Sequence, residues 1–295
     1  MPSPAAVEVI RLWPDGPPSR IENVPDEIAY EVTQGVAQGM TFIRNISDPT
    51  LSVYAPAPGA GNGCGVIVAP GGGWTINAWA HEGIDVADWL TGEGYTVFIL
   101  KYRVMASETD NAKFQERWAS MDQGPMERLP AAKLPRSMSK LISSDRYLEA
   151  RGAAADDGRR AITIARERAG DFGLDPASIG MVGFSAGAFL AIDVAMDPQD
   201  TPLAFVAAVY GGETNGAWIP EDAPPLFSVV AQDDVLWKIC EGLYLDWSNA
   251  DRSAEQHVFA RGGHGFGMVQ RGAPSDRWTD LLLAWMTDVR ARGAS

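Results

Sequence analysis

The pattern of apolar positions along the chain predicts strands that alternate with helices. Uninterrupted apolar runs at residues 65–70, 96–100 and 179–182 are typical of strands buried on both faces of a sheet. Residues 76–90 are helix-like, and strand, helix and strand in this order form a parallel crossover unit. We also expect helices over 148–172, over 236–247 and near the C-terminal end, and strands over 205–210, 225–231 and 255–260. The pattern therefore predicts an α/β fold, with a mostly parallel central sheet flanked by helices.

Two segments depart from this alternation. Residues 7–57 contain short β-rich pieces, such as 40–43 and 51–54, which predict an antiparallel opening to the sheet. Residues 104–147 have no strand signature, and we expect a small helical insertion there because a structureless loop of that length is rare in a compact domain. Its apolar residues are Phe114, Trp118, Met121, Met126, Leu129, Leu134 and Met138. The insertion either covers a pocket as a lid or lies over the surface without a part in function.

Composition narrows the classes of function. The 295 residues are 46% hydrophobic, and 24 Lys and Arg against 38 Asp and Glu give a net charge of −14. A protein that binds nucleic acid or an anionic membrane needs a positively charged surface, so neither is expected as a partner. No window approaches the ~20 apolar residues of a spanning helix, and residues 1–21 lack the features of a signal peptide, so we expect a cytoplasmic protein. Cys64 and Cys240 have no metal-ligand spacing and are predicted to be buried free thiols.

One stretch carries a candidate nucleophile. The apolar run at 179–182 leads into Gly-Phe-Ser-Ala-Gly at residues 183–187, followed by small and apolar residues. A serine at this place, Ser185, sits on a tight turn between a strand and a helix, with the helix's first N–H groups nearby. Side chains at Gly183 or Gly187 would collide with neighbouring backbone as the chain doubles back. The alternative is an ordinary strand-to-helix turn with an exposed serine.

Two further strand ends supply partners for this serine. Asp234 follows the strand at 225–231 and His264 follows the strand at 255–260. Because the carboxyl ends of parallel strands meet at one edge of a sheet, we expect Ser185, Asp234 and His264 to lie together. Histidine can take the proton of the serine hydroxyl and later return one to a leaving group, while a carboxylate orients the imidazole.

The choice of acid and base has alternatives. Asp233 follows the same strand as Asp234, and one of the two carboxylates is expected to cap the helix that begins near residue 236. Among the three histidines, His81 lies within a predicted helix and His257 within a predicted strand. His264 lies in a glycine-flanked loop from which a base can reach a serine, so it is the favoured base.

Acyl transfer also needs N–H donors for the oxyanion of its tetrahedral intermediate. The N–H of Ala186, next to the serine, is the expected first donor. Glycines 71–73, after the strand at 65–70, can turn further N–H groups inward without side-chain obstruction. A phosphate-binding loop is disfavoured because neither Lys-Ser/Thr nor the G-x-G-x-x-G spacing follows.

Several of these segments together resemble a known family. They are Pro-Gly-Gly-Gly-Trp at 70–74, Glu82-Gly83, Trp89-Leu90, Lys-Tyr-Arg at 101–103, the serine turn at 183–187, Asp233-Asp234, and Gly-Gly-His-Gly-Phe-Gly at 262–267. The chain resembles the α/β-hydrolase serine esterases of the acetylxylan-esterase and feruloyl-esterase-like group. The resemblance implies the α/β-hydrolase fold, an oxyanion hole of Gly72, Gly73 and Ala186, and Asp234 as the acid, with no metal or cofactor needed. The sequence has no internal repeat and no linker, so we expect a single domain over 1–295. The lid-like insertion at 104–147 is a departure from the simplest members of the family, in which it is much shorter.

The resulting hypothesis is a serine carboxylesterase that hydrolyses short-acyl, acetyl-type esters of sugars or small alcohols through an acyl-enzyme on Ser185. Its partner would be a small-molecule ester, bound in a pocket walled by the insertion with Trp74 and Trp237. Two rivals are an amide hydrolase of the arylformamidase type and a non-catalytic binding protein on a hydrolase scaffold. A glycosidase is disfavoured because that chemistry usually uses two carboxylates and leaves the serine, acid and histidine unexplained.

Overall fold

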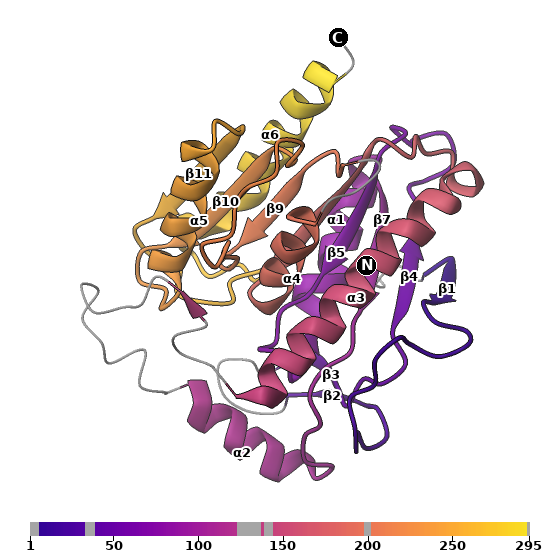
Figure 1. Cartoon of the computed structure of the whole chain (residues 1–295), viewed down its shortest axis with the longest axis vertical. Coiled ribbons are helices and arrows are strands. Elements are labelled where there is room, and N and C mark those ends of the chain that lie inside the picture. The colour runs from indigo at the N-terminus through magenta and orange to yellow at the C-terminus, as the bar shows by residue number, and fades with distance from the viewer. Residues whose placement is uncertain (1–5, 33–38, 123–136, 139–143, 198–201, 294–295) are drawn as a thin grey trace.

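A large sheet forms the centre of the molecule (Figure 1). The computed structural model describes residues 6–32, 39–122, 137–138, 144–197 and 202–293. The sheet has eight strands in the order β1 (Glu8–Arg11), β4 (Thr50–Tyr54), β7 (Thr96–Lys101), β5 (Gly65–Ala69), β8 (Ile179–Phe184), β9 (Val206–Val209), β10 (Leu226–Ala231) and β11 (Ala254–Phe259). All pairs from β7 to β11 are parallel, whereas β1 and β4 pair antiparallel. The predicted α/β class and the antiparallel opening are therefore confirmed.

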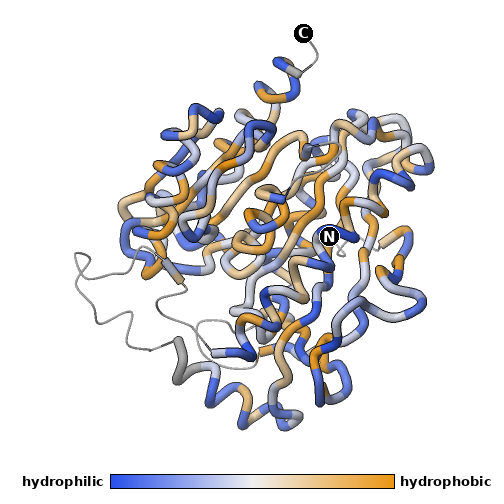
Figure 2. The backbone as a smooth tube through the Cα atoms, in the orientation of Figure 1, coloured by the Kyte–Doolittle hydropathy of each residue, from blue (hydrophilic) through white to orange (hydrophobic). Residues whose placement is uncertain are grey.

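Helices cover both faces of this sheet. One hydrophobic cluster joins one face to α3 (Asp145–Glu167), α4 (Ala186–Ala195) and α5 (Trp237–Asn249). The other joins the opposite face to α1 (Asp85–Gly92) and α6 (Trp278–Gly293). Successive strand residues point to opposite faces, so Val66 and Val68 enter the second cluster and Ile67 the first. Figure 2 shows the hydrophobic residues concentrated along the central strands, as this burial on both faces requires.

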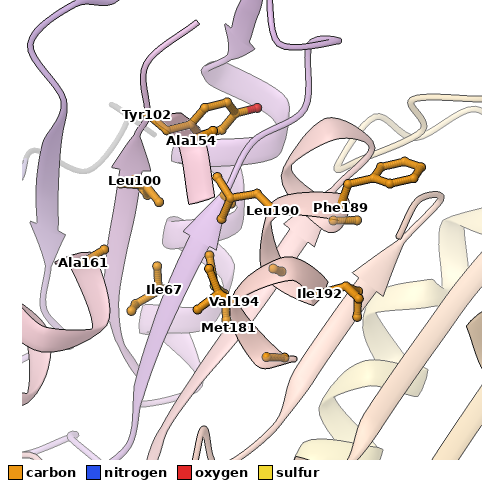
Figure 3. Packing of buried hydrophobic residues seen from close by; sticks show 14 of the residues in the cluster. Ile67, Leu100, Tyr102, Ala154, Ala161, Met181, Phe189, Leu190, Ile192 and Val194 are labelled. Carbon is orange, nitrogen blue, oxygen red and sulfur yellow. The ribbon is translucent and has the colours of Figure 1, made fainter. Parts of the chain in front are cut away.

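Helices α3 and α4 pack closely over the strands that carry the glycine-rich turns. Figure 3 shows Leu190 and Val194 of α4 close to Ile67 and Met181 of the sheet, in the same hydrophobic cluster. A Cβ at Gly158 of α3 would lie 2.8 Å from side-chain carbons of both Leu190 and Val194. The close approach of the two helices therefore depends on glycine at that position.

The helix predicted over 76–90 was partly wrong. Ile76–Ala78 forms strand β6, which pairs with β3 (Thr41–Arg44), itself paired with β2 (Ile28–Glu31), in a separate antiparallel sheet. A π-helical turn, η1 (Ala80–Ile84), then leads into α1. The helical pattern did not reveal β6 because its pairing partner lies more than thirty residues earlier in the chain. The helix predicted over 148–172 ends as α3 at Glu167 and continues as a 3-10 turn, Ala169–Phe172.

The predicted insertion is described only in part. It contains α2 (Asn111–Asp122), whose Phe114 and Trp118 pack against the three-stranded sheet. Met138 is buried, and its N–H donates a hydrogen bond to Glu213 Oε2 at 2.8 Å. Met126, Leu129 and Leu134 lie outside the described residues, as does the side chain of Met121. The lid at 104–147, and the single domain over 1–295 that contains it, stay predictions.

Candidate active site

Ser185 lies on a strained turn between β8 and α4. Its backbone has φ 49° and ψ −116°, a conformation that costs on the order of 1–3 kcal/mol for a residue with a side chain. The two glycines of the motif permit the turn. A Cβ at Gly183 would lie 2.1 Å from the carbonyl oxygen of Gly187, and a Cβ at Gly187 would lie 2.0 Å from that of Ala69. The serine side chain is thereby held at the carboxyl end of the central strand, as the motif predicted.

A chain of hydrogen bonds links Ser185 to the other two predicted residues. Ser185 Oγ lies 2.8 Å from His264 Nε2, and His264 Nδ1 lies 2.8 Å from Asp234 Oδ2. The ionised carboxylate only accepts hydrogen bonds, so Nδ1 carries the proton and Nε2 accepts from the serine hydroxyl. This tautomer is the one in which histidine can take the serine proton.

The two neighbouring aspartates have different partners. Asp234 is 2% exposed, and its Oδ1 accepts from the N–H of Leu236 at 2.8 Å while Oδ2 accepts from His264. Asp233 accepts from the N–H groups of Gly262 and Gly263 at 3.0 and 2.8 Å. Asp234 thus contacts both the histidine and the N–H of Leu236, the residue that precedes α5, whereas Asp233 holds the histidine loop. Within the described residues, helix α5 has no side-chain cap, so the prediction that one of the two aspartates caps it was wrong.

The glycine run at 71–73 begins beside Ser185, since a Cβ at Gly71 would lie 2.9 Å from Ser185 Cβ. The N–H of Gly71 donates to Glu82 Oε2 at 2.7 Å, so that N–H is occupied. Gly72 and Gly73 have φ +131° and +57°, and a Cβ at Gly72 would lie 2.3 Å from the carbonyl oxygen of Ile76. Within the described ranges, no hydrogen bond uses the N–H of Gly72, Gly73 or Ala186 as its donor. Their role as oxyanion donors stays a prediction.

The two predicted pocket tryptophans have different surroundings. Trp74 is 2% exposed. Its ring packs edge-on against Tyr147, with ring centroids 4.6 Å apart, and at a tilt against Phe189, with centroids 5.6 Å apart. Trp237 is half-buried at the start of α5, three residues after Asp234, and Lys238 Nζ lies 3.6 Å from its ring centroid. Their contact with substrate stays a prediction.

Arg271 braces the histidine loop, and no sequence signal pointed to it. Its guanidinium donates to the carbonyl oxygens of Gly262 at 3.0 Å, His264 at 3.2 Å and Gly265 at 2.6 Å. Asp233 accepts from two backbone N–H groups of the same loop, while Arg271 donates to its carbonyl oxygens. The loop is therefore fixed by side chains from outside it.

Motif residues that carried the resemblance also have partners that the sequence did not reveal. The hydroxyl of Tyr102 donates to the carbonyl oxygen of Pro70 at 2.6 Å, at the start of the glycine run. Burial, reinforced by the nearby charge of Glu82, raises the pKa of Tyr102 far above its ordinary value, so the hydroxyl keeps its proton. Arg103 forms a buried ion pair with Asp157 at 2.8 Å.

The remaining chemical predictions concern cysteines, metals and membranes. Cys64 and Cys240 are buried free thiols, as predicted, and burial raises the pKa of both. Among the described residues, no group of three or more His, Cys, Asp or Glu side chains is arranged to hold a metal ion. None of the helices in the described ranges has the length and apolar character needed to cross a membrane.

The sheet order, the strand-turn-helix around Ser185, and an acid and a histidine after later strands define the α/β-hydrolase fold. Known proteins agree with this class. An α/β hydrolase from a deep-sea metagenome library has a TM-score of 0.56 to this chain and 20% identity, covering 90% of this chain and 97% of its own. An acetyl ester-xyloside bifunctional hydrolase from Caldicellulosiruptor lactoaceticus has a TM-score of 0.63 and 20% identity, covering 97% of each chain.

The sequence itself matches an acetylxylan esterase from Xylanibacter ruminicola. The two are 21% identical over 286 residues, which cover 85% of this chain and 51% of that esterase. The chain thus spans about half the length of this curated relative. No protein-family model matches the chain. The predicted resemblance to esterases of the acetylxylan type is confirmed at low identity.

Proposed function

We propose that this protein is a serine carboxylesterase with Ser185 as nucleophile, His264 as general base and acid, and Asp234 as the carboxylate that orients His264. The observation that carries the proposal is the hydrogen-bond chain from Ser185 Oγ through His264 to a buried Asp234, with both links at 2.8 Å. Beside it lie three backbone N–H groups without an acceptor in the described part of the chain. These are the components that ester hydrolysis by a serine nucleophile requires.

The reaction proceeds in two halves. His264 Nε2 takes the Ser185 hydroxyl proton as Oγ bonds to the ester carbonyl carbon, and the carbonyl oxygen becomes an oxyanion. The intermediate then collapses, the bond to the alcohol oxygen breaks, and that oxygen takes the proton from His264. In the second half, water gives a proton to His264 as its oxygen bonds to the acyl carbon of the acyl-serine. The bond from that carbon to Ser185 Oγ then breaks, the acid leaves, and His264 returns the proton to Oγ.

The N–H groups of Gly72, Gly73 and Ala186 are the proposed oxyanion donors. Gly72 and Gly73 have the positive φ that lets successive peptide N–H groups turn toward one point. Ala186 is the first residue of α4, so its N–H also lies at the positive end of the helix dipole. Loss of a single donor of this kind costs roughly 3 kcal/mol of transition-state stabilisation.

For the substrate, we infer a short acyl group, such as acetate, on a sugar or small alcohol. The support comes from relatives: an acetylxylan esterase and an acetyl ester-xyloside hydrolase. A panel of p-nitrophenyl esters of increasing chain length, together with acetylated xylose, tests this inference. Including N-formylkynurenine tests the amide-hydrolase rival, and preference for it over acetate esters would overturn the ester proposal.

The nucleophile is tested by Ser185→Ala, with Ser178→Ala as the matched control. Ser178 precedes β8 at the opposite end of the same strand, so its loss leaves the site untouched. We expect Ser185→Ala to lower kcat on p-nitrophenyl acetate by at least ~10³-fold, since removing a triad serine can cost up to ~10⁶. Both variants should keep the wild-type circular dichroism. Substantial turnover by Ser185→Ala, or no fluorophosphonate adduct on wild-type Ser185, would refute the assignment.

A further inference from the structure

A buried carboxylate that belongs to neither the triad nor the oxyanion donors lies behind the site. Glu82 is 3% exposed and sits in the π-helical turn η1. Its Oε2 accepts from the N–H of Gly71 at 2.7 Å, and its Oε1 accepts from the hydroxyl of Tyr210 at 2.6 Å. One buried side chain therefore joins the glycine run after β5 to the end of β9.

Tyr210 extends this connection to the histidine loop. Its hydroxyl accepts from the N–H of Gly267 at 3.0 Å, so it donates to Glu82 and accepts from Gly267 at the same time. Its ring lies edge-on to His264, with ring centroids 5.1 Å apart, and to Phe266 at 4.6 Å. Tyr210 thus contacts both the backbone of the loop and the imidazole itself.

Glycine at position 267 makes the contact with η1 close. A Cβ there would lie 2.9 Å from His81 Cδ2 and 3.0 Å from the His81 carbonyl oxygen. The same carbonyl oxygen accepts from the N–H of Met268 at 3.1 Å. The turn that carries Glu82 is therefore in direct contact with the histidine loop, as well as with the glycine run.

The protonation of Glu82 suits this arrangement. Burial by itself raises the pKa of Glu82, but the hydrogen bond and charge of His81 and the hydrogen bonds from Tyr210 and Gly71 outweigh burial and hold the pKa below its ordinary value. An ionised carboxylate only accepts, so it directs the Gly71 N–H toward itself. The peptide that precedes Gly72 is thereby fixed in one orientation.

We propose that Glu82 and Tyr210 are positioning residues that hold the oxyanion loop and the His264 loop at the separation the reaction requires. This inference rests on the proposed serine esterase function. The oxyanion loop contains the proposed donors at 72 and 73, and the other loop contains the base at 264. Glu82 holds the oxyanion loop through the N–H of Gly71, and Tyr210 holds the His264 loop through the N–H of Gly267. The two side chains are hydrogen-bonded to each other. Both act through the backbone that they hold rather than on the reacting atoms.

The test compares Glu82→Gln and Tyr210→Phe with the control Tyr95→Phe. Tyr95 is also buried but precedes β7, at the opposite end of the sheet. Kinetics on p-nitrophenyl acetate, thermal midpoints, and the inhibition constant of a trifluoromethyl ketone, which forms a tetrahedral adduct with the serine, are measured for each. We expect kcat to fall by ~10–100-fold in the two site variants with KM changed by less than ~3-fold, because a misplaced donor loses part of what a deleted one loses.

The inhibitor distinguishes a loss of positioning at the active site from a general loss of stability of the fold. Affinity for the trifluoromethyl ketone should fall by the same factor as kcat/KM, because both report stabilisation of the tetrahedral state. Retention of kcat within threefold in Glu82→Gln, or a fall in kcat without a matching loss of inhibitor affinity, would overturn the inference. If Tyr210→Phe does not fold, Glu82→Gln decides alone. Absence of Ser185-dependent turnover in the wild type would instead overturn the proposed function, and this inference with it.

Discussion

Replacing Asp234 by asparagine tests the proposed acid, and its consequence follows from the two hydrogen bonds that the carboxylate makes. In the wild type, Oδ1 accepts from the N–H of Leu236 and Oδ2 accepts from His264 Nδ1, both at 2.8 Å. Asparagine has one oxygen and one NH₂ group for these two positions. If its NH₂ faced the N–H of Leu236, two buried donors would oppose each other at a cost of about 1–3 kcal/mol.

The favoured orientation therefore places the asparagine NH₂ against His264. Nδ1 must then accept, the imidazole proton moves to Nε2, and Nε2 donates to Ser185 instead of accepting its proton. The same substitution in a serine protease lowers kcat by about 10⁴, which corresponds to roughly 5.4 kcal/mol at 1.36 kcal/mol per decade. We expect Asp234→Asn to lower kcat/KM on p-nitrophenyl acetate by ~10³–10⁴ with little change in the thermal midpoint.

Asp233→Asn is the matched control because its side chain contacts the same loop. Its remaining oxygen can still accept from the N–H groups of Gly262 and Gly263, so only the charge is lost. That loss is worth about 1 kcal/mol, or less than tenfold in kcat. A larger loss in Asp233→Asn than in Asp234→Asn, or more than a tenth of wild-type kcat/KM in Asp234→Asn, would refute this reasoning.

Two further predictions concern stability. Gly187→Ala places a Cβ 2.0 Å from a strand carbonyl oxygen and should lower the free energy of urea unfolding by more than about 4 kcal/mol. The control Gly170→Ala, whose Cβ has no atom within 4 Å, should lower it by less than about 1 kcal/mol. Equal losses in the two variants would contradict the clash. Burial raises the pKa of Glu82, but its hydrogen bonds and the charge of His81 hold that pKa below its ordinary value. The ionised carboxylate therefore stabilises the fold above about pH 4.3, the ordinary pKa of glutamate. This stabilisation is lost as the pH falls through the pKa of Glu82 in the folded protein. The unfolding free energy of wild type minus that of Glu82→Gln should be constant near neutral pH and shrink in acid; a difference that grows in acid would contradict this.

The strands and the residues at their ends were predictable because their signals are local. Continuous apolar runs bounded by glycine and proline mark the parallel strands, and parallel strands bring their carboxyl ends to one edge. That rule predicts that Ser185, Asp234 and His264 lie together, and their side chains do form a hydrogen-bonded chain. Their catalytic roles are the subject of the proposed function.

What the sequence did not predict depends on contacts between distant segments. The hydroxyl of Tyr210 meets Glu82 across 128 positions, and the sequence singles out Glu82 only as part of a motif. Strand β6 forms because a partner in β3 is available, which overrides the helix-like pattern of its residues. The use of Asp234 for both the Leu236 N–H and His264 follows from the path of the chain after β10, which no spacing rule encodes.

Backbone strain indicates the same location without reference to any motif. Among the described residues, seven that are not glycine have positive φ, and four of these are Asn or Asp, which tolerate that region. The other three are Trp74, Ser185 and Tyr210, at φ 54°, 49° and 41°. They follow β5, β8 and β9, which are adjacent in the sheet. Each costs on the order of 1–3 kcal/mol, so their sum is comparable with the net 5–15 kcal/mol by which a typical domain is stable. Strain of that size persists only where the surroundings fix it, and Glu82, Tyr102 and the packed core beneath α4 supply that support at this edge.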